Sequence, residues 1–416
     1  MAKAQITLPL EIPDVRVLKT EINAAGEVII TVESIKKETR CRKCGRTISK
    51  FHGYDDWVQV RYLPVFGRSS YLRYRPRRYQ CLDCADHATT TQRLEWHDPR
   101  SQFTLAYEDH LLVQLIHSTI EDVRIKEGLS YDSVLGVLER RIDPTVDWSS
   151  FSQIGTLGLD EIAPKKGQGH YLVILTSRQA EGRLRILAVL PDRQKETVLD
   201  FLRSIPERLK RTIQTVCSDM YEGYTEAVKE VLPQARLVID RFHVTEAYRD
   251  GLDNLRKVEL HRLKQDLPKE DFAALKGSLW ALRKSPEDLT PQDRQVLKRL
   301  FGYSPELKLA YHLQRQLTTI FDRPLRQSSA KASLRAWIKR VRKSGLTCFD
   351  PFLATVDHWW EEITAFFVTR ANSGFVEGLN NKLKVLKRRC YGLFNHQHWF
   401  QRIFLDLEGY HRFGLA

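Results

Sequence analysis

The chain of 416 residues is long enough for two or three domains with a sizeable core. Its 66 Lys and Arg residues outnumber 52 Asp and Glu residues, and the net charge of +14 favours polyanionic partners, nucleic acid first. A hydrophobic content of 42% excludes a disordered chain, and no apolar run reaches membrane-spanning length, which predicts a soluble, cytoplasmic protein. The seven cysteines are then expected to be thiols or metal ligands rather than disulfides.

Two Cys-x-x-Cys pairs predict a tetrahedral zinc site in the N-terminal region. Gly45, directly after the first pair, permits the tight turn of a zinc knuckle. The 36 residues between the pairs exceed the usual ribbon spacing and imply strands extended into a hairpin arm. His52 and His87 lack the spacing to replace a cysteine, and the alternative is four unrelated thiols. The four expected ligands are Cys41, Cys44, Cys81 and Cys84.

Residues 71–79 lie between the two pairs and interleave basic with aromatic side chains. At strand period, Arg73, Arg75 and Arg77 share one face, which suits phosphate contact together with stacking on bases or sugars. Ten Lys and Arg residues between positions 42 and 80 are offset by only two acids. We therefore expect DNA contact here, the alternative being a solvated strand face.

A helix-turn-helix is predicted next. Residues 104–118 have helical apolar spacing, residues 119–123 begin a short capped helix, and Gly128 provides a turn. Ser130 caps a last helix that runs to about residue 142. Two helices joined by a Gly-containing turn fit this motif, although helical hairpins that never touch DNA show the same pattern. Residues 143–148 are expected to link it to the next domain.

In the central segment, three strands in hairpin order precede two further strands, each of which follows a helix. This β-β-β-α-β-α-β order is that of the ribonuclease-H-like fold, in which the first and fourth strands are neighbours. Asp160 and Asp219 lie on those two strands, so their carboxylates can meet. The strands are expected at 155–161, 170–176, 184–190, 212–219 and 235–240, and the helices at 195–205 and 222–231.

A third acid, Glu377, projects from a later helix. The helix has an apolar stripe, and Glu377 lies opposite it with Asn381, Lys384 and Arg388 and with no other acid. Three carboxylates would hold two Mg²⁺ ions, for which Mn²⁺ can substitute, and these would activate a water or a 3′-hydroxyl for attack at phosphorus. The alternative is an ordinary amphipathic helix with a solvated face. The stripe consists of Val376, Leu379, Leu383 and Leu386.

Other polar side chains compete for these roles or support them. Glu161, Asp192 and Asp240 are rival acids, and Asp240 is also a candidate supporting ligand at a strand end. His243 is either a supporting group or a hydrogen-bonded structural histidine, and Asn381 is a further candidate beside the metals.

Residues 244–371 are expected to be almost entirely helical and to form an insertion before the last catalytic helix. Trp280, Trp337, Trp359 and Trp360 are expected to anchor its core, while its many Lys and Arg residues face either DNA or solvent. The helices are expected at 245–264, 272–284, 291–301, 305–321, 330–343 and 348–368.

Together these segments resemble the ISL-three family of bacterial insertion-sequence transposases, of the DDE class, over nearly the whole chain. The most specific match is VEGLNNK at 376–382. The other matching segments are LDEIA at 159–163, KKG at 165–167, LPDR at 190–193, CSDMYEGY at 217–224, DRFH at 240–243 and LKRR at 386–389.

The resemblance implies an enzyme that binds the terminal inverted repeats of an insertion sequence, cleaves DNA at its ends and joins them to target DNA. Asp160, Asp219 and Glu377 would be its metal-binding triad, and Arg193, Lys384 and Arg388 would neutralise phosphate. It would act as a homo-oligomer, a dimer on DNA, in the bacterial cytoplasm and nucleoid without a membrane. The alternatives are a non-catalytic DNA-binding descendant and a structure-specific nuclease on the same fold.

The expected architecture is multidomain α+β. It comprises a zinc ribbon at 1–99, a helix-turn-helix at 100–148, the first part of the ribonuclease-H-like catalytic core at 149–243, an all-helical insertion at 244–371 and the last core helices at 372–416.

Overall fold

The computed structural model describes residues 10, 12–163, 171–179, 182, 184–370, 374–390 and 395–414, with the backbone alone for 374–380. The chain divides into two compact units, Met1–Asp143 with Phe404–Ala416, and Pro144–Ile403. The boundary falls within the last helix α16 (His396–Phe413), so the residues from Phe404 onward belong to the first unit, whereas all of residues 372–416 were expected to group with residues 149–243. Among the described residues, no helix is long and apolar enough to cross a membrane.

The first unit contains a four-stranded sheet in the order β1-β2-β7-β6. Alternate residues of its strands face one side, as the period of two in a strand requires, and Ile30, Val60 and Leu72 pack there with Trp96. β6 and β7 pair antiparallel, which gives the predicted hairpin arm. The strands are β1 (Val15–Ile22), β2 (Val28–Ser34), β6 (Val58–Val65) and β7 (Arg68–Tyr74).

Five short strands build the ribbon beside this sheet. One pair, β3 and β4, forms a two-stranded hairpin, and the other three form a sheet in the order β5-β8-β9. Ile48 and Tyr79 bury their side chains beside Cys41 and Cys81, which gives the ribbon a small core of its own. The strands are β3 (Thr39–Arg40), β4 (Thr47–Ile48), β5 (Lys50–Tyr54), β8 (Arg77–Gln80) and β9 (Thr89–Thr91).

Three helices follow, as predicted, and each has a capping side chain at its start. The hydroxyls of Thr104, Thr119 and Ser130 each accept a hydrogen bond from a backbone N–H in the first turn of the next helix. Gly128 ends the second helix with a positive φ of 64°, a conformation that glycine adopts without strain. The helices are α1 (Leu105–Leu115), α2 (Ile120–Glu127) and α3 (Tyr131–Arg141).

The second unit contains a five-stranded sheet in the order β12-β11-β10-β13-β14. β10 pairs antiparallel with β11 and parallel with β13, so the first and fourth predicted strands are neighbours, as expected. Apolar residues of these strands and of α4 and α6 share one core. The elements are β10 (Gly155–Ile162), β11 (Leu172–Arg178), β12 (Leu184–Leu190), α4 (Lys195–Ser204), α5 (Glu207–Lys210), β13 (Ile213–Ser218), α6 (Glu222–Val231) and β14 (Arg236–Ile239), after a short 3-10 turn at Trp148–Ser150.

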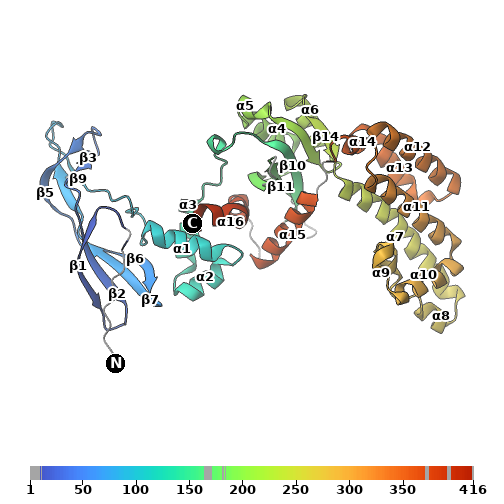
Figure 1. The fold of residues 1–416 in the computed structure, drawn as a ribbon, viewed down its shortest axis with the longest axis horizontal. Helices are drawn as coiled ribbons and strands as arrows, with labels where there is room; N and C mark the ends of the chain where they lie inside the picture. The colour runs from blue at the N-terminus through green and yellow to red at the C-terminus, as the bar shows by residue number, and fades with distance from the viewer. Residues whose placement is uncertain are drawn as a thin grey trace. The chain divides into compact units, whose positions relative to one another are not determined.

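A group of helices follows β14, and α14 packs against that strand (Figure 1). Their core includes Tyr248, whose ring stacks on Phe349 at 4.4 Å between ring centroids. The helices are α7 (Arg241–Asp266), α8 (Lys269–Ala273), α9 (Ser278–Arg283), α10 (Pro291–Tyr303), α11 (Pro305–Asp322), α12 (Gln327–Ser344), α13 (Asp350–His358) and α14 (Trp360–Thr369), with 3-10 turns at Pro286–Asp288 and Thr347–Phe349.

Two of the predicted helices in this group are wrong in extent, and one predicted core residue is wrong. The helix expected at 272–284 breaks at Gly277, whose φ is 92°, and the one expected at 348–368 breaks at Trp359. Trp337 and Trp359 are buried as expected, and Trp360 is half-buried, but Trp280 is 63% exposed. The short α9 presents that indole to solvent because Ala281 and Leu282, rather than Trp280, face the core.

Helix α15 (Gly374–Arg389) lies against β10. Leu383 and Leu386 of the predicted apolar stripe are buried, and the Lys387 ammonium donates to the Ala163 carbonyl just beyond β10. The side chains of the other two stripe residues lie outside the described part of the chain. The helix that carries Glu377 is therefore attached to the strand that carries Asp160.

Candidate active site and DNA-binding modules

Two aspartates lie close together on adjacent parallel strands of the five-stranded sheet, Asp160 within β10 and Asp219 directly after β13. The register of β10 and β13 pairs Gly158 with Cys217. Asp160 and Asp219 each lie two residues further along, so the pairing carries them to the same level of the sheet. Asp160 is only 8% exposed. The structure thus brings together the two acids that the strand order predicted.

The surroundings of Asp219 disfavour its charge. Burial, followed by the nearby carboxylates of Glu161 and Asp160, raises the pKa of Asp219 to about 7, although His243 and Arg193 act in the opposite direction. Its Oδ1 atom is buried and has no hydrogen-bond partner among the described residues. A buried carboxylate oxygen without a donor, beside other carboxylates, fits a hard divalent cation such as Mg²⁺.

Glu161 is also close to Asp219, but the protein itself satisfies its carboxylate. One oxygen accepts a hydrogen bond from the Tyr224 hydroxyl at 2.8 Å, and the other lies 3.5 Å from the Arg193 guanidinium. That guanidinium also lies over the Tyr221 ring, 5.1 Å from the ring centroid. The sequence alone does not single out the buried Tyr224, although it ends the matching segment 217–224, because a tyrosine at helical spacing is ordinarily a core residue.

The remaining candidates beside the pair have structural partners. Asp192 accepts hydrogen bonds from the Gln194 N–H and the Thr197 hydroxyl at the start of α4. Asp240 is buried and caps α7, since its Oδ1 accepts the Phe242 N–H at 2.8 Å. His243 follows in the first turn of α7, with Nδ1 3.8 Å from a Glu246 oxygen.

The structure describes the third predicted acid only in part. Glu377 lies on α15, but its side chain is outside the described residues, so its place in the triad stays a prediction. Further along α15, Asn381, Lys384 and Arg388 are exposed, which leaves their polar groups available to a ligand. Arg193 is 45% exposed at its side chain and pairs with Glu161.

The four predicted cysteines gather at the ribbon. Cys41 Sγ lies 3.8 Å from Cys84 Sγ, Cys44 Sγ lies 3.6 Å from Cys81 Sγ, and all four sulfurs are within 4.8 Å of one another. Tetrahedral zinc with bonds of about 2.3 Å separates its sulfurs by about 3.8 Å, so the quartet has the size of a zinc site. Backbone N–H groups of Cys44 and Lys43 lower the pKa of Cys41 to about 6, which favours the thiolate that zinc binds.

The basic arm differs from its predicted form. β7 ends at Tyr74 and β8 begins at Arg77, because Pro76 lacks the N–H that a continuous strand needs. The three arginines therefore do not share one strand face, and the Arg77 guanidinium turns to a Glu33 carboxylate at 3.4 Å. Arg73 and Arg75 stay exposed and lie over the rings of two exposed aromatic residues. These contacts are Arg73 over Trp57 at 4.9 Å and Arg75 over Tyr54 at 5.4 Å.

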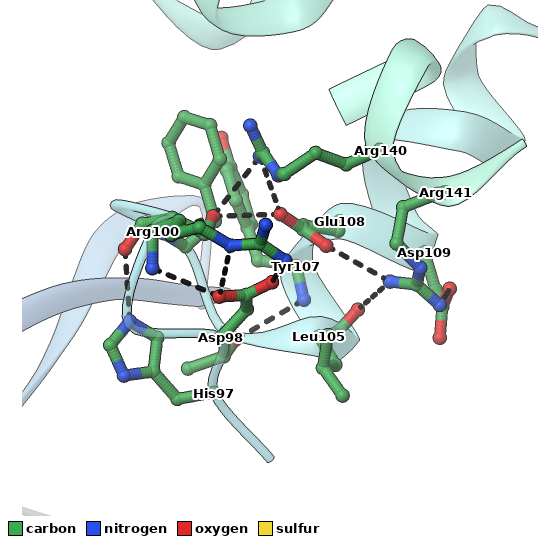
Figure 2. Close-up of polar contacts among 12 residues, drawn as sticks. His97, Asp98, Arg100, Leu105, Tyr107, Glu108, Asp109, Arg140 and Arg141 are labelled. Carbon is green, nitrogen blue, oxygen red and sulfur yellow. Dashed lines mark hydrogen bonds and ion pairs between the residues drawn. The ribbon is translucent and has the colours of Figure 1, made fainter. Parts of the chain in front are cut away.

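A buried ion network holds α1 against α3 in the helix-turn-helix region (Figure 2). The Glu108 side chain is 1% exposed, and its oxygens lie 2.7 Å from the Arg140 guanidinium and 3.2 Å from that of Arg141. The Ser101 hydroxyl donates to the same carboxylate at 2.7 Å, and Arg141 also reaches Asp109 at 2.6 Å. One buried carboxylate thus links α1 to two arginines of α3, in addition to the apolar residues that both helices bury.

Sequence families match each of these parts. A family model described as "Transposase", for the DDE domain of the ISL3 family, matches residues 157–403, more than half of the chain. The "helix-turn-helix domain of transposase family ISL3" matches residues 92–142, and a zinc finger of the transposases of IS204, IS1001, IS1096 and IS1165 matches residues 37–84. The chain therefore belongs to the ISL3 family of transposases.

Individual relatives agree with this assignment. The transposase for insertion sequence element IS1001 of Bordetella parapertussis is 27% identical over 378 residues, which cover 90% of each chain. The transposase for insertion sequence element IS1557 of Mycobacterium tuberculosis is 22% identical over 397 residues, covering 89% of this chain and 86% of the relative.

Proposed function

We propose that this transposase binds the terminal inverted repeats of its element, cleaves DNA at the element ends and joins them to target DNA. The observation that carries the proposal is the position of Asp160 and Asp219 at the same level of two adjacent parallel strands, with a buried Asp219 oxygen that lacks a hydrogen-bond donor among the described residues. These two carboxylates and that of Glu377 would hold divalent metal. Two Mg²⁺ ions bound there would supply Lewis-acid activation of the attacking and leaving oxygens.

We interpret the five-stranded sheet as a ribonuclease-H-like core and α7–α14 as a helical insertion in it. The sheet order β12-β11-β10-β13-β14, antiparallel on one side of β10 and parallel on the other, supports the first interpretation. The second is supported by the separate apolar core of the helices, which follow β14 and precede α15.

Cationic side chains of the chain would neutralise the charge of the reacting phosphate. Arg193 is partly exposed beside Glu161, and Lys384 and Arg388 are exposed on α15. Held near the reacting phosphate, such cations stabilise the charge that develops on its oxygens. In the first unit, the exposed N-terminal end of α3 would contact bases, and Arg73 and Arg75 would contact the backbone.

The test is cleavage of a duplex that carries the element end, by the variants Asp160→Asn, Asp219→Asn and Glu377→Gln. Each should abolish cleavage and leave DNA affinity nearly unchanged, because a lost ligand removes the metal but not the DNA-binding modules. Asp200→Asn is the matched control, since that carboxylate is 82% exposed on α4. Cleavage at a near wild-type rate in one variant would exclude that residue from the triad and make Glu161 the next candidate.

The same assay separates the two rival functions. A DNA-binding descendant would bind the element end without cleaving it. A nuclease would cleave but would not join a 3′-hydroxyl end to a second duplex. Joined products that disappear in the Asp219→Asn variant would exclude both.

A further inference from the structure

Helix α12 and the turn before it form a strongly basic segment. Residues 323–344 carry eight Lys and Arg residues and no acid, within a chain whose net charge is +14. The helix buries Leu334, Trp337, Ile338 and Val341, so its apolar stripe faces the helical core. Its other faces carry the charge. The exposed cations of α12 are Arg335, Lys339, Arg340, Arg342 and Lys343.

A groove runs along each side of α12. The first, of about 650 Å³, lies between α11 and α12, where Arg315, Arg323 and Arg340 line it together with the hydroxyl-bearing Thr319 and Ser333. The second, of about 500 Å³, lies on the other side of α12. Its lining residues include Arg335, Lys339, Arg342 and Trp360. Both grooves therefore present cations, and the first adds neutral hydrogen-bond donors.

Protein acids neutralise only part of this charge. Lys331 pairs with Glu361 at 2.7 Å and Arg342 with Asp357 at 2.8 Å. Within the described part of the chain, no acid pairs with Arg315, Arg323 or Lys339. Among the residues that the structure describes, the Arg340 side chain hydrogen-bonds only the neutral Gln316, at 3.0 Å. These like charges repel one another unless a polyanion neutralises them.

One end of the first groove is connected to the five-stranded sheet through the start of α7. Arg323 directly follows Asp322, whose carboxylate pairs with the Arg241 guanidinium. Arg241 in turn directly follows Asp240 at the end of β14, whose backbone N–H bonds to the Ser218 carbonyl of β13 at 2.9 Å. The Arg323 end of the groove is thus connected, through the Asp322–Arg241 pair and Asp240, to the strand ends beside Asp219.

We propose that the two grooves beside α12 bind the phosphate backbone of duplex DNA, as a contact surface additional to the helix-turn-helix, the ribbon and the carboxylate site. Guanidinium, ammonium and hydroxyl groups are the usual donors to phosphate. From Lys331 to Lys343 the helix rises about 18 Å, along which a duplex carries about ten phosphate charges. The proposal rests on the function of the chain as a DNA-binding transposase. It does not require that the carboxylates act as proposed, because binding of DNA to these grooves involves no catalytic step.

The test compares two triple variants of the full chain, each of which removes three positive charges. Arg315→Gln, Arg323→Gln and Arg340→Gln alter the first groove, and Lys264→Gln, Lys269→Gln and Lys276→Gln are the control, at exposed lysines with no ion pair among the described residues. Affinity is measured by fluorescence anisotropy over a range of salt concentrations, with one duplex carrying the element end and one of random sequence.

The groove variant should lower the slope of log affinity against log salt by up to about 3, and the affinity at 0.1 M salt by up to about 500-fold, since each phosphate contributes about 0.9 to the slope. A loss confined to the end duplex would assign the surface to element DNA, and a loss on random duplex to target DNA. Equal behaviour of the two variants on both duplexes would overturn the proposal.

Chemical protection tests the same surface in the unaltered protein, so the result does not depend on the folding of a variant. Bound duplex should slow acetylation of Lys339 and Lys343 severalfold and leave Lys264 and Lys276 unchanged. Unchanged acetylation of Lys339 and Lys343 at saturating DNA would also overturn the proposal.

Discussion

Neutralising Glu108 should loosen the helix-turn-helix region while leaving its shape almost unaltered. Glu108→Gln keeps the size of the side chain but removes the charge that faces the Arg140 and Arg141 guanidinium groups at 2.7 and 3.2 Å. Removing one partner of a buried ion pair costs about 3–5 kcal/mol. The two arginine side chains are 30% and 22% exposed and can turn partly to water, so we expect the lower value, about 3 kcal/mol.

Amide hydrogen exchange of the full chain measures this change locally, since the protein has two compact units and need not unfold in one step. A loss of about 3 kcal/mol corresponds to about a 100-fold faster exchange of protected amides in α1 and α3, because 1.4 kcal/mol is tenfold. Exchange in the second unit should stay unchanged. The matched control is Asp98→Asn, which removes a carboxylate paired with the 83% exposed Arg100 side chain. An exposed pair contributes less than about 1 kcal/mol, so exchange should rise less than about fivefold.

Equal exchange in α1 and α3 of the Glu108→Gln variant and the unaltered protein would refute the assignment of Glu108 as a group that stabilises the packing of these helices. A 100-fold increase spread over both units would refute the local nature of the effect.

Three further predictions concern the metals and DNA. Removing zinc by chelation or by Cys81→Ser should release one Zn²⁺ per chain. The backbone amides of the ribbon should then exchange faster, while exchange in the second unit stays unchanged. Unchanged exchange of the ribbon amides in zinc-free protein would contradict this prediction. With divalent ions chelated, the raised pKa of Asp219 means that its native state favours the proton, so stability falls by up to about 4 kcal/mol as the pH rises from about 4 to about 7. In thermal melts, the melting temperature of the Asp219→Asn variant should not show this fall with pH. If the melting temperatures of the variant and the unaltered protein fall in parallel as the pH rises, the prediction is wrong. Tyr131→Ala on α3 should reduce the preference for the element end over random duplex. Arg73→Ala together with Arg75→Ala should weaken the binding of both duplexes alike and lower the slope of log affinity against log salt by at most about 2. The reverse pattern would mean that the arginines read the sequence and that α3 contacts the backbone.

Patterns that depend on neighbours along the chain were predictable. The Cys-x-x-Cys spacing led to four sulfurs within 4.8 Å of one another, and the caps at Thr119 and Ser130 begin helices where expected. The order of strands and helices placed Asp160 and Asp219 on adjacent strands. These features follow from local periodicity and from the few ways in which a chain can connect neighbouring strands.

The partner and the exposure of a side chain were not predictable where they depend on contacts with segments far away in the sequence. The strand period predicted that Arg73 and Arg77 share one strand face. In the structure, Pro76 divides the strand, and the Arg77 guanidinium pairs with the carboxylate of Glu33 on another strand. Trp280 has a large apolar side chain that is typical of a core residue. The break at Gly277 nevertheless leaves this side chain exposed.

The sequence by itself determined the family, the four clustered cysteines and the two strand aspartates, because these rest on spacing and order along the chain. Only the tertiary structure decided that Tyr224 and Arg193 satisfy Glu161 while an Asp219 oxygen has no donor among the described residues, and that the cations of α11 and α12 line common grooves. Burial, hydrogen-bond partners and the meeting of charges from separate helices arise from packing between segments far apart in sequence, which no local pattern encodes.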